Sequence, residues 1–154
     1  MRIVEYTSTD VEPLLPCIVS YKRECKVDEF GLDAEPIELV KTLIELIEGE
    51  DSTLFVLMDN DSVVGFIGVM TGKFPFSQKR YGCEYYWYIL PPYRGVSSMR
   101  LFRAAVEWSK QRGCSHFIST ASRAASSLYE KVVDIYESIG MKHYASDYIM
   151  DIGG

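Results

Sequence analysis

The segment from Tyr85 to Met99 holds the residues of this 154-residue chain that are best suited to chemistry. It reads as an aromatic strand, a double proline, a tight turn and the start of a helix. Backbone N–H groups at a helix start can bind an anion, because the helix dipole places positive charge there. Arg94, Arg100 and Arg103 add positive charge nearby. The segment therefore indicates a pyrophosphate-binding turn, with an ordinary capped helix and surface arginines as the alternative.

Two adjacent prolines define where the aromatic strand stops. Pro91 and Pro92 have no N–H to donate, so pairing must end at Leu90. A helix connects this strand to the next one, which predicts a parallel pair. A gap at the carboxyl ends of two parallel strands is where open α/β sheets bind ligands. We therefore expect a ligand slot beside residues 85–90.

The elements that position this segment follow from hydrophobic periodicity and from turn residues. They predict one domain, residues 1–154, with a mixed α/β fold. An antiparallel meander precedes the parallel pair, and helices cover both faces of the sheet. We expect strands at 2–6, 53–58, 62–71, 82–90 and 115–120, one or two more within 142–152, and helices at 11–22, 36–48, 98–112 and 124–139.

Composition excludes several classes of protein. The net charge of −6 argues against a nucleic-acid surface, which would need a basic stripe. No stretch approaches the roughly 20 apolar residues of a membrane span. The four cysteines lack metal-pair spacing, so we expect no metal site, and free thiols favour the cytoplasm. A secreted protein with two disulfides is the minor alternative.

The order of motifs resembles the GCN5-related N-acetyltransferase (GNAT) superfamily over nearly the whole chain. The segment Ile89–Gly95, I-L-P-P-Y-R-G, is similar to the family's phosphate-binding turn, and Tyr136–Lys142, Y-E-S-I-G-M-K, to its C-terminal motif. The resemblance implies a mostly antiparallel sheet with strands four and five splayed apart. It also implies transfer of an acetyl group from acetyl-CoA to a primary amine, by direct attack in a ternary complex.

The resemblance assigns the cofactor-binding residues to the end of the fourth strand and the turn after it. A backbone N–H at a bulge in that strand would stabilise the thioester oxygen, and its position falls at Tyr88, Ile89 or Leu90. The whole set is Tyr88, Ile89, Leu90, Arg94, Gly95, Val96, Ser97, Ser98, Met99 and Arg100. Ser97 and Met99 stand where the family has Gly or Ala, and methionine brings bulk towards the expected phosphates.

Two catalytic residues are carried over by position. Tyr136 is the expected acid for the departing thiolate, with a core tyrosine as the alternative. Glu84 is the expected base; strand alternation would put it on one face with Tyr86 and Tyr88, among aromatics that raise its pKa. A rim glutamate with no role is the alternative, and water with Tyr85 and Tyr86 could replace it as the base.

The acceptor is expected over the first two helices and the loop 26–35. Asp28, Glu29 and Asp33 in that loop could attract a cationic amine, either a small molecule or a peptide. The resemblance leaves a homodimer open. Two other hypotheses are a degenerate, non-catalytic protein that binds acyl-CoA, and a module that dimerises through its aromatic strand.

Overall fold

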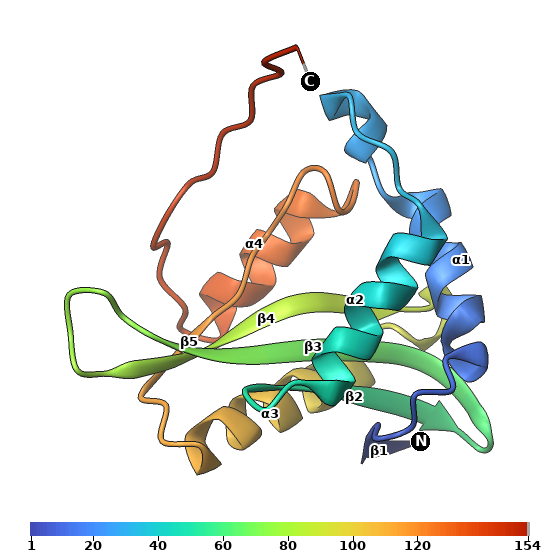
Figure 1. Ribbon diagram of the computed structural model, residues 1–154, viewed down its shortest axis with the longest axis horizontal. Helices are drawn as coiled ribbons and strands as arrows, with labels where there is room; N and C mark the ends of the chain where they lie inside the picture. Colours follow the sequence, from blue (N-terminus) through green and yellow to red (C-terminus); the bar gives the residue numbers. More distant parts are fainter. Residues whose placement is uncertain (154) are drawn as a thin grey trace.

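A computed structural model describes residues 1–153 of the chain, and Figure 1 shows a central sheet with helices on both sides. Most sequence-predicted elements are confirmed, with shifted ends. The strands are β1 (Arg2–Glu5), β2 (Ser52–Asp59), β3 (Ser62–Lys73), β4 (Arg80–Ile89) and β5 (His116–Ile118). The α-helices are α1 (Leu15–Glu24), α2 (Pro36–Glu48), α3 (Val96–Gln111) and α4 (Tyr129–Ser138). Short 3-10 helices are η1 (Glu12–Leu14), η2 (Val27–Phe30) and η3 (Pro91–Tyr93).

The five strands lie in the order in which they occur along the chain, β1-β2-β3-β4-β5. The first four pair antiparallel, and β4 pairs parallel with β5. The crossover through α3 accounts for this one parallel pair, because two consecutive strands joined by a helix run in the same direction. The predicted mixed sheet is therefore confirmed.

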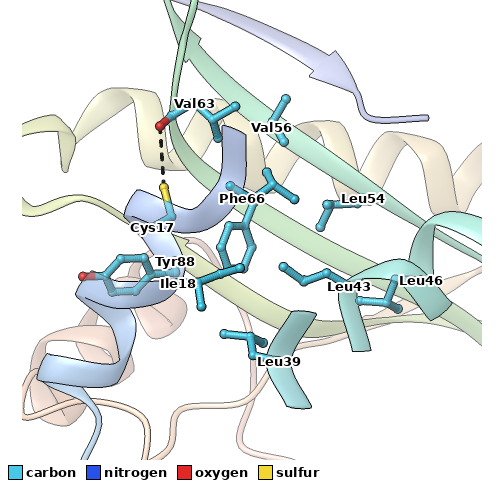
Figure 2. Close-up of a cluster of buried hydrophobic side chains, with 11 residues drawn as sticks. Cys17, Ile18, Leu39, Leu43, Leu46, Leu54, Val56, Val63, Phe66 and Tyr88 are labelled. Atoms are coloured by element: carbon cyan, nitrogen blue, oxygen red, sulfur yellow. Dashed lines mark hydrogen bonds between the residues drawn. The ribbon is translucent and has the colours of Figure 1, made fainter. Parts of the chain in front are cut away.

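Two apolar cores cover the two faces of the sheet. On one face, α1 and α2 pack on alternate residues of β2, β3 and β4, including Leu54, Phe66 and Tyr88 (Figure 2). The Cys17 thiol on α1 lies 3.7 Å from the carbonyl of Val63 and adds a weak hydrogen bond between this helix and β3. On the other face, α3 and the buried Tyr136 of α4 pack on residues such as Ile67. Burial of the apolar side chains on both faces stabilises the packing of the helices against the sheet.

The segment between β5 and α4 differs from the sequence prediction at both ends. Strand β5 ends at Ile118 instead of residue 120, because the Thr120 N–H turns to a side-chain acceptor, Glu84 Oε2, at 3.2 Å. Helix α4 starts at Tyr129 instead of residue 124. The hydroxyls of Ser122 and Ser126 accept N–H groups of the intervening residues, and such local bonds compete with a helix.

The prediction of strands within residues 142–152 was wrong. No strand occurs in this part of the described chain, which leaves α4 and extends away from the sheet (Figure 1). Strand β5 is only three residues long and gives a further strand little backbone to pair with. The apolar side chains that suggested strands are exposed instead; Tyr148, for example, is 95% exposed.

The described residues contain no helix that is both long and apolar enough to cross a bilayer. All four cysteines are free thiols.

Candidate active site

The candidate site is a slot between β4 and β5. The two strands pair only from Tyr81 with His116 to Cys83 with Ile118. Strand β4 continues to Ile89, bonded to β3 alone, before the prolines at positions 91 and 92 begin η3. Within residues 1–153 the β5 side of Glu84–Ile89 has no ladder partner. The predicted parting of the parallel pair is confirmed, and it begins earlier than the double proline requires.

The backbone donors that face the slot can be deduced from one hydrogen bond. The Leu90 N–H donates to the Val64 carbonyl of β3 at 2.9 Å. Successive residues of a strand direct their N–H groups to opposite edges, so the Tyr88 N–H also faces β3 and the Ile89 N–H faces the slot. Of the three N–H groups predicted to stabilise an oxyanion, Ile89 is the one whose direction suits that role.

The bulge of β4 lies elsewhere than the resemblance implied. Tyr86 pairs with Gly68 and Glu84 pairs with Val69, so Tyr85 is the extra, unpaired residue. The expected position at residues 88–90 was wrong, because the ladder with β3 is regular there. An extra residue in one strand reverses the faces of the side chains beyond it.

This bulge separates Glu84 from the tyrosines with which it was predicted to share a face. Tyr86 and Tyr88 pack on the core formed with α1 and α2. Glu84 pairs with Val69, which belongs to the core under α3 and α4, and so Glu84 lies on that opposite face. The prediction of a single face was wrong, and its consequence is that Glu84 reaches residues of the β5–α4 region.

Glu84 and Tyr136 are joined by one serine, Ser119. The Ser119 hydroxyl lies 2.9 Å from Glu84 Oε2 and 2.7 Å from the Tyr136 hydroxyl. The Thr120 N–H also donates to Glu84 Oε2, at 3.2 Å. The structure therefore brings together the two predicted catalytic residues, which are 52 positions apart in the numbering, through a residue that the sequence did not single out.

Burial controls the ionisation of both groups. Glu84 is 8% exposed, and desolvation raises its pKa, although the bonds from Thr120 and Ser119 act in the opposite direction. Desolvation, together with the nearby Glu84 charge, raises the pKa of Tyr136 far above that of an ordinary phenol. Its ring packs against Trp87 and Phe102. Both the core-tyrosine and the acid interpretations of Tyr136 thus fit its position.

The start of α3 presents two backbone donors, the N–H groups of Val96 and Ser97, between two that are already bonded. The Gly95 N–H donates to Ser98 Oγ at 3.2 Å, and the Ser98 N–H donates to the Gly95 carbonyl at 3.0 Å. The N–H groups of Val96 and Ser97 belong to the first turn and have no intrahelical acceptor. Gly95 has φ of 126°, a conformation that glycine adopts readily, and it directs the chain into the helix.

Two of the arginines near this turn bond to other parts of the chain. The Arg94 side chain donates to the Ile89 carbonyl at 2.9 Å and pairs with Glu24 of α1 at 2.5 Å. It also lies over the Tyr88 ring. Arg100 points towards the Met1 carbonyl, at 3.4 Å. Arg94 therefore ties the turn to α1, and the N–H groups of Val96 and Ser97 are the donors that the turn itself offers.

Met99 lies on the core side of α3. Its side chain packs against the core between the sheet, α3 and α4. It also borders a groove along α3 that includes Phe102, Arg103 and Ile139. Residues 97–99 already belong to the helix, and Met99 falls on its inner side; that methionine brings bulk towards the phosphates stays a prediction.

A cavity of about 260 Å³ lies on the face of the sheet opposite to α3, between α1, η2, α2 and β4. Tyr21 and Tyr86 form part of its wall, and Asp33, Glu35 and Glu38 line its acidic side. Of the three acidic loop residues predicted to attract an amine, only Asp33 lines this cavity. Asp28 and Glu29 lie on η2 outside it.

The arrangement of sheet, splayed pair and helix start defines an acyltransferase fold of the GNAT type. The family model described as "Acetyltransferase (GNAT) family" matches residues 19–135. The chain belongs to this family.

Solved structures agree with the fold. This chain is similar to a transcriptional regulator from Bacillus halodurans C-125, with TM-score 0.76, 18% identity and coverage of 98% of this chain and 99% of the other. It is similar to a ribosomal-protein-alanine N-acetyltransferase from Brucella melitensis biovar Abortus 2308, with TM-score 0.73, 18% identity and 99% of each chain. It is also similar to an aminoglycoside 6'-N-acetyltransferase from Acinetobacter haemolyticus, with TM-score 0.72, 13% identity, and 98% and 97% coverage. No curated protein matches the sequence.

Proposed function

We propose that this protein is an N-acetyltransferase that moves the acetyl group of acetyl-CoA to a primary amine within a ternary complex. The observation that carries the proposal is the slot beside residues 84–89, which has Glu84 and Tyr136 hydrogen-bonded to one serine at its side. Family membership supports the reaction class. The acceptor is a small-molecule or peptide amine, and the cytoplasm is the proposed compartment.

The residues present fit acetyl-CoA. The N–H groups of Val96 and Ser97 suit a diphosphate at a helix start. The unpaired edge of β4 suits an extended pantetheine arm, because its free N–H and C=O groups need partners. Bound acetyl-CoA would supply a thioester, whose carbonyl carbon is open to attack by an amine.

Each step of the transfer has a candidate residue in this chain. Glu84 takes the amine proton, and its raised pKa makes it a stronger base than an ordinary carboxylate. The Ile89 N–H faces the slot, where it would stabilise the carbonyl oxygen as negative charge develops. The Tyr136 hydroxyl holds a proton for the departing sulfur. The cavity at Tyr21 and Tyr86 would receive the rest of the acceptor, whose amine would reach Glu84 through the slot between β4 and β5, because Glu84 lies on the other face of the sheet.

Two measurements test this function. Calorimetry with acetyl-CoA should show binding, and thiol release should appear with at least one member of a panel of primary amines. A lack of binding at millimolar acetyl-CoA would contradict the proposal.

The second candidate is a non-catalytic protein that binds acyl-CoA. The engagement of Arg94 with Glu24 favours it, since this guanidinium is not free to meet a diphosphate. Binding without thiol release, over the whole panel, would support this candidate. The third hypothesis, dimerisation through the aromatic strand, would use the same unpaired edge of residues 84–89 that the proposed cofactor needs, so acetyl-CoA binding would argue against it.

A further inference from the structure

We propose that Ser119 relays a proton from Glu84 to Tyr136 during transfer, so that the acceptor's proton ends on the departing thiol. The inference rests on the proposed function and adds a residue that the family resemblance did not assign. It starts from the two short bonds of the Ser119 hydroxyl, 2.9 Å to Glu84 Oε2 and 2.7 Å to the Tyr136 hydroxyl.

A serine hydroxyl has one proton, so it cannot donate to both neighbours at once. When Glu84 is a carboxylate it only accepts; Ser119 then donates to Glu84, and Tyr136 donates to Ser119. When Glu84 is protonated, the chain can reverse: Glu84 donates to Ser119, and Ser119 donates to Tyr136. The reversed chain frees the Tyr136 proton for an acceptor in the slot.

The ionisable groups around Glu84 do not compete with Ser119 and Tyr136 for its proton. No basic side chain forms an ion pair with Glu84 among residues 1–153. The titratable neighbours that bear on the pair are Tyr21 of α1, whose pKa is raised in part by the Glu84 charge, and Cys83 beside it in β4. Both are neutral at pH 7, so neither competes for the proton.

One oxygen of Glu84 remains open for the amine. Glu84 Oε1 makes no hydrogen bond within the described chain, and Oε2 takes both bonds, from Ser119 and Thr120. The only fully buried side-chain polar atom without a partner in residues 1–153 is Arg80 Nε. Glu84 Oε1 therefore keeps some contact with solvent, and a half-turn of the carboxyl group brings its proton to Ser119.

The atoms of the step balance. The amine nitrogen forms a bond to the acetyl carbon, and the C–S bond breaks with its electron pair on sulfur. The amine proton goes to Glu84, a proton passes from Glu84 to Ser119 Oγ, another from Ser119 to the Tyr136 oxygen, and the phenol proton goes to sulfur. Tyr136 never has to remain as a phenolate, which its burial disfavours.

The first test uses turnover. Ser119→Ala should lower kcat about 10-fold or more, at unchanged affinity for acetyl-CoA. Ser119→Thr keeps a hydroxyl and should restore most of the rate, whereas Ser115→Ala, a matched change of an exposed serine just before β5, should leave it unaltered. Ser119→Ala with Tyr136→Phe should be no slower than the slower single variant, because both interrupt one path.

The second test needs no acetyl-CoA. The pKa of the Glu84 carboxyl is followed by NMR of protein with ¹³C-labelled glutamate. Ser119→Ala should raise this pKa, because it removes a donor to the carboxylate. Tyr136→Phe should raise it when Ser119 is present and have no effect in the Ser119→Ala background.

The results separate the relay from the proposed function. Absence of acetyl-CoA binding by the wild-type protein overturns the function. An active wild-type protein with an equally active Ser119→Ala variant overturns the relay alone. A Glu84 pKa that responds to Tyr136→Phe equally with and without Ser119 also overturns the relay, whether or not the protein has activity.

Discussion

Replacing Tyr136 with phenylalanine separates its chemical role from its packing role. The change removes only the hydroxyl, which lies 2.7 Å from Ser119 Oγ and 3.5 Å from the Thr120 carbonyl. The ring keeps its contacts with Trp87 and Phe102. The expected loss of stability is therefore that of one good hydrogen bond, about 1 kcal/mol. For a domain of this size that corresponds to a fall in Tm of about 2–4 °C.

The expected loss of activity is larger than the loss of stability. General acid catalysis typically contributes about 10²–10⁴-fold, and a thiolate, being a good leaving group, needs no more than the lower end of that range. We expect kcat to fall about 10- to 100-fold, which is about 1.4–2.7 kcal/mol of barrier. The affinity for acetyl-CoA should not change, since the hydroxyl is not needed to hold the ligand.

The assay is thiol release at saturating acetyl-CoA, with calorimetry and thermal unfolding on the same samples. Tyr129→Phe is the matched control. Tyr129 is the first residue of the same helix, and its ring lies under the Arg123 guanidinium at 4.2 Å, a contact that phenylalanine can keep. Tyr129→Phe should turn over at the wild-type rate. An unchanged kcat in Tyr136→Phe would remove this residue from its proposed role.

Three further predictions concern Glu84 and two glycines. Burial raises the Glu84 pKa, so kcat should rise with pH through a value above the ordinary glutamate range. For the same reason Glu84 stabilises the fold most at low pH, below the ordinary glutamate pKa, and this contribution to the free energy of unfolding is lost as pH rises. Glu84→Gln should abolish both dependences in pH–rate and urea-unfolding series, and unaltered curves would place the base elsewhere. Gly95→Ala should cost about 1–3 kcal/mol in thermal unfolding, because φ of 126° strains any other residue; an equal Tm would mean that the turn has another conformation. A Cβ on Gly82 would overlap Ser109 of α3, so Gly82→Ala should destabilise the fold by about 1–3 kcal/mol. Adding Ser109→Gly should recover part of this loss, and no recovery would mean that the strain lies elsewhere.

The sequence predicted the fold well where local signals were strong. Helix α2 was expected from its apolar spacing and from Pro36 and Gly49, and it lies at Pro36–Glu48. The parting of β4 from β5 was expected from the double proline and does occur, but it begins at Glu84, where the three-residue β5 has already ended. For α2 the signal is local, because a repeated apolar spacing between a proline and a glycine determines the outcome.

The site was predicted in part, because two of its features depend on distant contacts. Six residues around Tyr85, from Cys83 to Tyr88, contain no glycine or proline that would indicate a bulge. The bulge is visible only in the pairing of β4 with β3, and it decides which face Glu84 occupies. Ser119 is one serine among many in the sequence, and only the approach of β4 and α4 gives it two partners.

The C-terminal segment shows that an alternating pattern of polar and apolar residues is not enough to predict a strand. Residues 142–152 have the pattern of strands, yet a strand needs a partner with free backbone groups. The short β5 does not provide one in this structure. Helix α4 illustrates a similar point, since local serine bonds at Ser122 and Ser126 delay its start by five residues relative to the prediction.

Backbone amide NMR during titration with acetyl-CoA tests the central claim most directly. The claim is that the unpaired edge of β4 and the first turn of α3 form one binding surface. It predicts that the amides of Ile89, Val96 and Ser97 shift together and saturate at a single ligand concentration. Shifts that are confined to other parts of the chain, or an unchanged spectrum at millimolar acetyl-CoA, would contradict it.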